Sequence, residues 1–200
     1  MPADAQEKEN SVLPAPADLA PIVERREMLR KKIAMLREKP ELRSREGQAL
    51  LADVAVFEKA ASWMLRFDEF PKTDYIDQLD EVIRKGLARA DTLYDGTADW
   101  SQQSGTTVRG YVSAVDNSVQ PYAITLPDGV DPKEAKRWPM HVVLHGRADQ
   151  MNEVNFIHRM DGKKRSQKAD QLPQDWIQLD VYGRGNNAYR WAGETDVFEA

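Results

Sequence analysis

Apolar residues recur every three or four positions in three stretches of the first half of the chain, which is the spacing of a helix with one buried face. These stretches are Leu19 to Leu36, Leu50 to Leu65 and Tyr75 to Ala90. Pro40 and Pro71 follow the first two, and Asp74 is a candidate N-cap for the third. Because the connections are short, the pattern predicts an antiparallel helical hairpin or a three-helix unit over residues 18–94.

Polar segments flank these helices. Residues 1–17 are polar and rich in Pro and Ala, which predicts a disordered lead-in, and they lack the basic segment followed by an apolar core that marks a signal peptide. Residues 95–106 are rich in Gly, Ser, Asp and Gln, which is typical of a linker. We therefore expect a helical accessory module joined to a second unit that begins at residue 107.

The pattern changes after this linker to short runs of β-branched and aromatic residues. Val108–Val112 and Tyr122–Leu126 flank the polar turn Asp116–Ser118, and together they predict an antiparallel hairpin. Met140–Leu144 and Trp176–Val181 are apolar enough to predict two buried strands.

Helical stretches accompany these strands. One, from Asn152 to Met160, separates the two buried strands, and another is expected to begin near Glu194. This alternation predicts an α/β fold with a mostly parallel sheet and helices packed on its faces. Two central parallel strands with one crossover leave at least one sheet edge unpaired. We therefore expect either the front part of a larger protein or a chain that needs a partner to complete its sheet.

Composition narrows the function classes. The 200-residue chain has no cysteine and a formal net charge of −5 at pH 7. The missing cysteines exclude disulfides, a thiolate metal site and a cysteine nucleophile. No apolar run approaches the roughly 20 residues needed to cross a bilayer, so we expect a soluble protein that does not span a membrane. The mild negative charge argues against nucleic acid as the main partner.

A glycine-rich segment follows the last predicted strand, and Gly183 to Ala188 satisfies Gly-x-Gly-x-x-Ala. In a dinucleotide site a helix would begin almost at once and direct its N-terminus at the pyrophosphate. Paired Asn residues and Gly193 disfavour a helix there, and the acidic residues after Gly193 make a better helix start. The segment is better explained as a long turn at the carboxyl edge of the sheet, where α/β proteins bind ligands. This turn carries Arg184, Asn186, Tyr189 and Arg190.

The dipeptide His145-Gly146 ends one predicted strand and precedes a polar loop and a helix. Glycine lets the backbone turn sharply, so that an amide N–H near Gly146 or Arg147 can point at a developing negative oxygen. This arrangement predicts an oxyanion hole, with His145 supporting the loop by hydrogen bonding rather than acting as a base. The simpler alternative is that His-Gly only ends a strand.

The histidines do not predict a metal site. His141 and His145 share one face of a strand, but at roughly 3.3 Å per residue they lie about 13 Å apart. That separation is too large for one ion with bonds of about 2 Å. His158, in the following helix, is expected to have a structural role at the surface or partly buried. We expect neither a metal nor a cofactor.

Three segments, taken in order, resemble the opening of α/β-hydrolase-fold serine hydrolases: "VRGYVSAVDNSVQPYAITLP", "PMHVVLHGRADQMNEVNF" and "WIQLDVYGRGNNAYRWAGETDVFEA". The similarity covers residues 107–200, and the closest group is that of bacterial prolyl-oligopeptidase-like and feruloyl-esterase-like enzymes. It implies the front part of an α/β-hydrolase sheet, with an antiparallel hairpin plus parallel strands, and an ester or peptide substrate.

The resemblance also assigns residues to the site. It implies that His145, Gly146 and Arg147 form the oxyanion-hole loop. It further implies that the loop after the next strand lines the mouth of the active site. The residues there that are expected to bind substrate are Tyr182, Arg184, Asn186, Asn187, Tyr189 and Arg190.

The nucleophile of that family is missing from the chain. In the family the serine lies in Gly-x-Ser-x-Gly, one strand further on, with the Asp and His later still. The chain contains no Gly-x-Ser. No base can be identified beside Ser101, Ser104, Ser113, Ser118 or Ser166. We therefore expect a fragment that supplies the oxyanion-hole loop and is inactive by itself.

The helical half leaves other interpretations open. Residues 24–39 form a basic amphipathic pattern that could dock on nucleic acid or an anionic membrane, but the interspersed acids are typical of a solvated face. We expect residues 18–94 to pack on the hydrolase part or to form a dimer, with Trp63, Phe67 and Phe70 as candidate contacts. Two further function classes are a non-catalytic protein that binds a ligand such as carbohydrate, and a helical interaction module with a degenerate α/β remnant.

Overall fold

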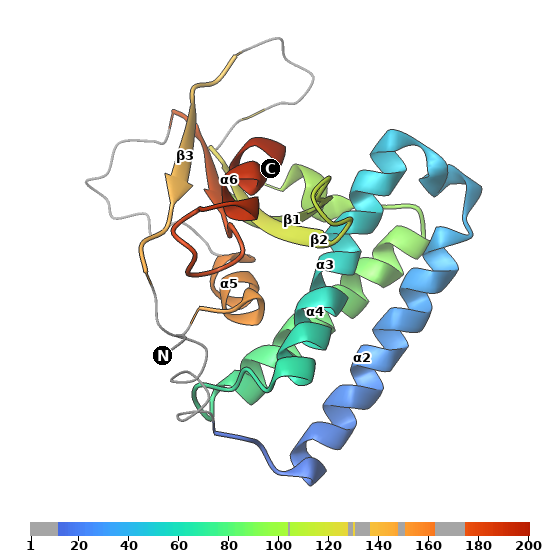
Figure 1. Ribbon diagram of the computed structural model, residues 1–200. Helices are drawn as coiled ribbons and strands as arrows, with labels where there is room; N and C mark the ends of the chain where they lie inside the picture. Colours follow the sequence, from blue (N-terminus) through green and yellow to red (C-terminus); the bar gives the residue numbers. More distant parts are fainter. Residues whose placement is uncertain (1–11, 104, 128–129, 131–136, 148–150, 163–174) are drawn as a thin grey trace, which may run out of the picture.

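The computed structural model describes residues 12–103, 105–127, 130, 137–147, 151–162 and 175–200. In chain order its elements are α2 (Pro16–Arg37), η2 (Pro40–Arg43), α3 (Arg45–Phe67), α4 (Tyr75–Tyr94), η3 (Asp99–Gln102), β1 (Gly105–Val112), β2 (Val119–Leu126), β3 (Met140–Leu144), α5 (Glu153–Met160), β4 (Ile177–Val181) and α6 (Ala192–Glu199). Figure 1 shows the three long helices side by side next to a small sheet. Each predicted helix and strand is present, and the fold has mixed α and β character.

The long helices form because each places an apolar stripe on one face. In α3, the N-cap Ser44 accepts a hydrogen bond from a backbone N–H one turn later, at 3.0 Å. Asp74 is the N-cap residue of α4, but its carboxylate makes no capping bond and accepts from the side chain of Gln78 at 3.1 Å. The largest fully buried side chains of the helical part include Leu29, Phe57, Met64 and Ile83.

The basic face of α2 is paired with acids of the neighbouring helices. Arg25 lies 2.6 Å from Asp80 of α4, and Lys32 pairs with Asp91 of the same helix. The Arg25–Asp80 pair is partly buried, whereas the Lys32–Asp91 pair is exposed, and an exposed pair contributes at most about 1 kcal/mol to stability. The pairs nevertheless neutralise charge that an anionic partner would need, which favours an ordinary solvated face for this helix.

The sheet formed by the described residues has four strands in the order β1-β2-β4-β3. β1 and β2 form the predicted antiparallel hairpin, β2 is antiparallel to β4, and β3 is parallel to β4. The expectation of a mostly parallel sheet is wrong, because a hairpin strand lies beside β4 and only one neighbouring pair is parallel. The chain passes from β3 to β4 through α5.

A buried carboxylate fastens α3 to the sheet. Asp53 of α3 is 1% exposed and accepts a hydrogen bond from the Gly110 N–H of β1 at 2.9 Å. It also accepts from Trp100 Nε1 at 3.1 Å and lies 2.6 Å from Arg109 Nε. Gly110 is needed here, because an added Cβ would lie 2.3 Å from the carbonyl oxygen of Ala52. Trp100 belongs to the predicted linker, yet it is buried and packed.

A second polar link comes from α4. Arg89 donates to the Val108 carbonyl of β1 at 2.7 Å and to Asp161 at 2.5 Å, and its guanidinium lies over the Phe57 ring. Burial lowers the pKa of Arg89, while Asp161 acts in the opposite direction. Around these links, one cluster of buried apolar residues extends from the helices to the sheet and α5. Helices and sheet therefore share a hydrophobic core.

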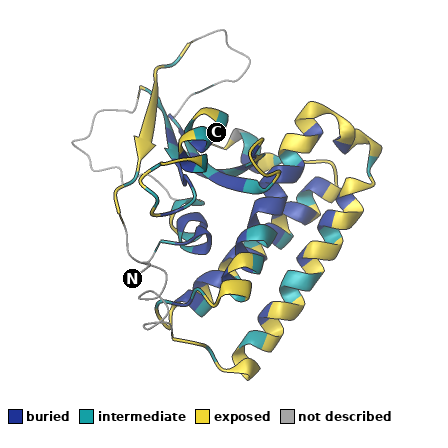
Figure 2. Ribbon diagram, in the orientation of Figure 1, coloured by how far each residue is buried: buried dark blue, intermediate teal, exposed yellow. Residues whose placement is uncertain are grey.

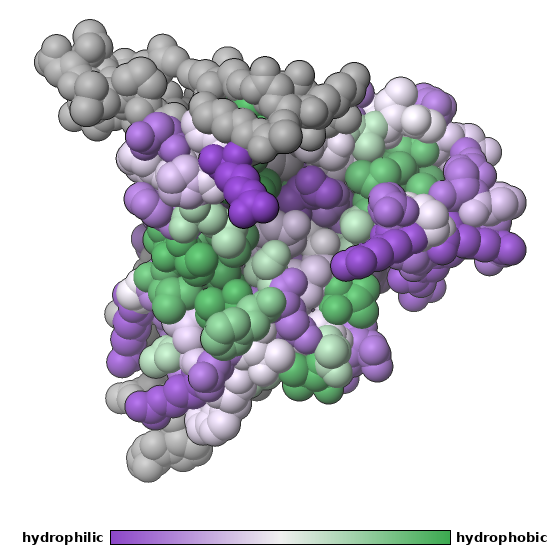
Figure 3. Space-filling view, turned by 90° about the horizontal axis from the view of Figure 1, so that it is seen from above, coloured by the Kyte–Doolittle hydropathy of each residue, from purple (hydrophilic) through white to green (hydrophobic). Residues whose placement is uncertain are grey.

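In the described part of the chain β3 lies at one edge of the sheet, and all five of its residues are exposed. The prediction of a strand at Met140–Leu144 is confirmed, but the prediction that it is buried is wrong. Among the described residues it pairs on one side only, with β4, whereas Leu179 and Val181 of β4 are buried. Figure 2 shows this strand exposed beside a more buried sheet, and Figure 3 shows hydrophobic side chains gathered in patches on the face seen from above.

The aromatic residues near the end of α3 divide into two groups. Phe70 is 1% exposed and lies in the core, whereas Trp63 and Phe67 are 44% and 46% exposed. The rings of Trp63 and Phe67 pack edge to face, with centroids 5.4 Å apart. Only Phe70 therefore packs as a core contact.

None of the described helices has both the length and the apolar character needed to cross a membrane.

Candidate functional site

The turns that follow β3 and β4 lie next to each other, because parallel neighbouring strands end at the same edge of a sheet. His145 links them. Its Nε2 lies 2.9 Å from the Tyr182 carbonyl oxygen, and its Nδ1 lies 2.8 Å from that of Gly146. Carbonyls only accept, so the neutral imidazole donates to one of the two carbonyls at a time, depending on its tautomer. These contacts are those of a side chain that supports the turn, as the sequence predicts.

Tyr189 provides a second link between the turns. Its hydroxyl accepts a hydrogen bond from the His145 N–H at 2.9 Å and donates to the Val181 carbonyl at 2.8 Å. Burial raises the pKa of Tyr189, although its hydrogen bond with His145 lowers it, so the hydroxyl keeps its proton at neutral pH. A Cβ added to Gly183 would lie 2.3 Å from the Tyr189 ring. Tyr189, predicted to bind substrate, thus ties the turn after β3 to the end of β4.

The turn after β3 presents an accessible amide. The ladder with β4 ends at Leu144, and the Gly146 N–H is hydrogen-bonded to none of the residues that the structure describes. Gly146 is exposed, and a Cβ added to it would meet nothing within 4 Å. Arg147 follows it on the exposed part of the turn. An oxyanion donor must be accessible in this way.

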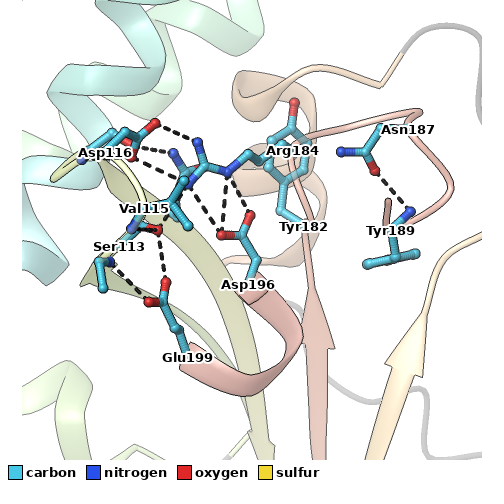
Figure 4. Close-up of polar contacts among 12 residues, drawn as sticks. Ser113, Val115, Asp116, Tyr182, Arg184, Asn187, Tyr189, Asp196 and Glu199 are labelled. Atoms are coloured by element: carbon cyan, nitrogen blue, oxygen red, sulfur yellow. Dashed lines mark hydrogen bonds and ion pairs between the residues drawn. The ribbon is translucent and has the colours of Figure 1, made fainter. Parts of the chain in front are cut away.

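Arg184 points away from these turns, toward the hairpin turn between β1 and β2 (Figure 4). Its Nη1 lies 2.6 Å from Asp116, its Nε 3.1 Å from Asp196 of α6, and its Nη2 donates to Ser113 at 3.0 Å. Partial burial lowers the pKa of Arg184, but the hydrogen bonds to Asp116 and Asp196 raise it more. The hydrogen bond from Arg184 is also the main cause of the lowered pKa of Asp116.

The structure therefore gives Arg184 a structural role. It joins the turn after β4 to the hairpin turn and to the first helical turns of α6. Glu199, near the end of α6, accepts from the Ser113 hydroxyl at 2.8 Å and strengthens the same connection. The predicted contact of Arg184 with substrate has no support in this geometry and stays a prediction.

The turn between β4 and α6 has an unusual backbone. Positive φ angles occur at Gly183, Arg184, Gly185, Ala188, Tyr189 and Trp191. Non-glycine residues adopt this conformation only where the surroundings fix it, and such strain is frequent at functional sites. α6 begins at Ala192 rather than directly after Gly185, so the segment does not form a dinucleotide-binding turn.

The other predicted substrate residues differ in accessibility. Asn186 and Arg190 are exposed at the surface of the turn. The Asn187 side chain accepts from the Tyr189 N–H at 2.9 Å and helps to shape the turn. Tyr182 is 7% exposed and packs on Phe156, and burial raises its pKa well above the ordinary value. Asn186 and Arg190 are therefore the best placed of the set to meet a ligand outside the turn.

The histidines outside the site make structural contacts. The His141 ring stacks on Trp176 with centroids 4.9 Å apart, and His158 Nδ1 lies 3.2 Å from Glu81. His158 is partly buried, as expected. In the part of the chain that the structure describes, no three His, Asp or Glu side chains are grouped to hold a metal ion.

One pair near the site was not found from the sequence. Lys59 of α3 pairs with Glu153 at the start of α5, with side chains 12% and 9% exposed. Burial raises the pKa of Glu153, and Lys59 acts in the opposite direction. These residues are 94 positions apart in the chain, and no local pattern signals such a contact.

Comparisons with protein-family models, with curated proteins and with solved structures found no match for this chain.

Proposed function

We propose that this chain is the front part of an α/β-hydrolase-fold serine hydrolase, an esterase or peptidase that acts through an acyl-enzyme. The observation that carries the proposal is the accessible Gly146 amide on a turn held by His145 and Tyr189. In α/β-hydrolases one oxyanion donor comes from the loop between the third strand and the following helix. The turn that carries Gly146 lies between β3 and α5.

The arrangement of the strands supports the same proposal. An antiparallel hairpin leads into a parallel pair joined through a helix, and the order β1-β2-β4-β3 with an antiparallel β2 resembles the beginning of an α/β-hydrolase sheet. β3 carries apolar residues on both faces, which is typical of a strand inside a parallel sheet, yet it is exposed. This mismatch favours further strands on its open side.

The proposed chemistry assigns distinct tasks to the residues. A serine from outside these 200 residues attacks the substrate carbonyl, and its proton passes to a histidine base that also lies outside them. The negative charge that forms on the carbonyl oxygen is stabilised by the Gly146 N–H. The leaving group takes the proton as the acyl-enzyme forms, and water then releases the acid. His145 transfers no proton and keeps the turn in place.

Labelling with a fluorophosphonate probe tests the proposal. The reading frame is continued past Ala200, and the extended and 200-residue proteins are treated side by side. We expect covalent labelling of the extended protein at a serine in Gly-x-Ser-x-Gly and none of the 200-residue chain. Labelling of the short chain, or a folded extended protein without labelling, would contradict the proposal. A coding sequence that stops at Ala200 would instead favour the non-catalytic alternatives.

A further inference from the structure

A pocket of about 150 Å³ lies where α3, α5 and the carboxyl edge of the sheet meet. α3 contributes Lys59 and Trp63, β2 contributes Gln120, and α5 contributes Glu153. The start of the turn after β4 completes the wall with Tyr182. A cavity of about this size accommodates one six-membered ring.

The charges of the wall are balanced. The four charged side chains that line the pocket are Lys59, Arg184, Glu69 and Glu153, two of each sign. Lys59 is paired with Glu153, and Arg184 is paired with Asp196. A charged ligand would bring a further charge into a partly enclosed space whose ion pairs are already formed, which is unfavourable. The pocket therefore favours a neutral ligand.

Two oxygen atoms of the wall residues lack a hydrogen-bond partner among the described residues. They are Gln120 Oε1 and Glu153 Oε2, and their residues are 3% and 8% exposed. Buried acceptors without a donor are unfavourable and are rare in folded proteins. Both atoms are buried, so their side chains have to rotate toward the pocket before a ligand that donates hydrogen bonds can satisfy them. The wall therefore favours hydroxyl groups over a purely apolar ring.

An aromatic ring stands at the rim of the pocket. Trp63 is 44% exposed, and its indole is held by Lys59, whose Nζ lies 4.5 Å from the ring centroid, and by Phe67, whose ring packs edge to face with it. A ring fixed in this way offers a flat apolar surface with little loss of side-chain freedom on binding. Such a surface suits the C–H face of a ring whose edges carry polar groups.

We propose that this pocket binds a neutral polyhydroxylated ring, which is a sugar unit, stacked on Trp63 with hydroxyls directed to Gln120 and Glu153. A ring without hydroxyls leaves the two oxygens unpartnered, and an amino sugar or a uronic acid adds a charge. The site needs no nucleophile, so it stands apart from the proposed hydrolase activity. If both hold, the sugar is a part of the substrate.

Titration of the ¹⁵N-labelled 200-residue chain tests the proposal. The probes are methyl β-D-glucopyranoside and methyl β-D-xylopyranoside, followed by NMR at the Trp63 indole N–H and the Gln120 side-chain amide. We expect saturable shifts with a dissociation constant of about 1 mM, the range usual for a small ligand. Glucosamine and glucuronic acid are expected to bind about tenfold more weakly.

Matched variants place the binding in the pocket. Trp63→Ala is expected to weaken binding about tenfold, and Glu153→Gln, which keeps the side-chain size, is expected to change the relative affinities of neutral and charged sugars. The control is Trp191→Ala, because Trp191 is 80% exposed and does not line the pocket. No shifts with either glycoside, or equal loss of affinity in the two tryptophan variants, would overturn the proposal.

Discussion

At the scale of single residues, two side chains set the geometry of the candidate site. His145 and Tyr189 each bridge the turn after β3 and the end of β4, and both bind backbone groups rather than each other's side chains. Backbone groups have fixed positions once the sheet has formed. These bridges therefore hold the Gly146 amide in place, which is the preorganisation that the proposed oxyanion role requires.

Tyr189→Phe tests this bridge. The variant removes the hydroxyl and leaves the His145 N–H and the Val181 carbonyl without their partner. We expect the free energy of unfolding to fall by about 1–3 kcal/mol, measured by urea denaturation. Tyr94→Phe, a change of the same type at a half-exposed position of α4, is the control and should alter stability by no more than about 0.5 kcal/mol. Equal effects of the two changes would show that the bridge is not formed.

The raised pKa of Glu153 predicts a pH dependence. Burial raises this pKa above its ordinary value of 4.5, so the folded state holds the proton more tightly than the unfolded state. This contribution to stability is fully present below pH 4.5 and is lost as the pH rises through the folded-state pKa. We expect Glu153→Gln to remove that part of the profile of unfolding free energy against pH. An unchanged profile above pH 4.5 would contradict the assignment to Glu153.

At the scale of elements, one guanidinium joins α6 to the hairpin turn, and its two carboxylate partners differ in how far they are exposed. Arg184 binds Asp196, which is 1% exposed, and Asp116, whose side chain is 43% exposed. A buried carboxylate depends on its partner far more than an exposed one does, because water cannot replace the lost interaction. The connection of α6 to the sheet therefore rests on the Arg184–Asp196 pair.

Arg184→Ala and Asp116→Asn separate the two pairs. Arg184→Ala leaves the buried Asp196 carboxylate without its ion-pair partner. We therefore expect a loss of about 3–5 kcal/mol in the free energy of unfolding. Asp116→Asn removes only the exposed pair, with an expected loss of at most about 1 kcal/mol. Both are measured by urea denaturation under the same conditions. A small effect of Arg184→Ala would mean that Asp196 finds another partner or is accessible to water.

The sequence predicts well where the helices and strands lie along the chain. It predicts less well which elements lie beside one another in the fold. Apolar spacing is a local property, so it locates α3, α4 and the hairpin, and Asn152 and the residues after Gly193 mark helix starts. The pairing of β2 with β4 and the exposure of β3 depend on contacts between distant segments, which apolar spacing does not encode. The role of Arg184 was missed for the same reason, because Asp116 lies 68 residues away.

At the scale of the whole molecule, the helical part and the sheet are not separated by a solvent layer. Asp53 and Arg89 reach from α3 and α4 into β1, and buried apolar residues continue from α2 to α5. The same arrangement brings Trp63 and Lys59 of α3 to the carboxyl edge of the sheet. The helices thus contribute to the surface beside the candidate site as well as to the core.

A shared core predicts one cooperative unfolding transition. We expect helix content, followed by far-UV circular dichroism, and the environment of the tryptophans, which include the buried Trp100, followed by fluorescence, to change together in urea. Asp53→Ala should shift both curves equally, because it removes partners from α3 and β1 at once. Two separate transitions would instead support independent units at residues 18–94 and 107–200.

The claim that an amide on the turn after β3 stabilises an oxyanion is tested most directly by removing that amide. In the extended protein that the proposal predicts to carry the nucleophile, Gly146→Pro eliminates the N–H, whereas Gly146→Ala keeps it and has room for the added methyl group. With circular dichroism verifying the fold, we expect kcat for a p-nitrophenyl ester to fall about 10²–10³-fold in the proline variant and far less in the alanine variant. Equal kcat values for a folded proline variant and the parent protein would contradict the proposed role of Gly146.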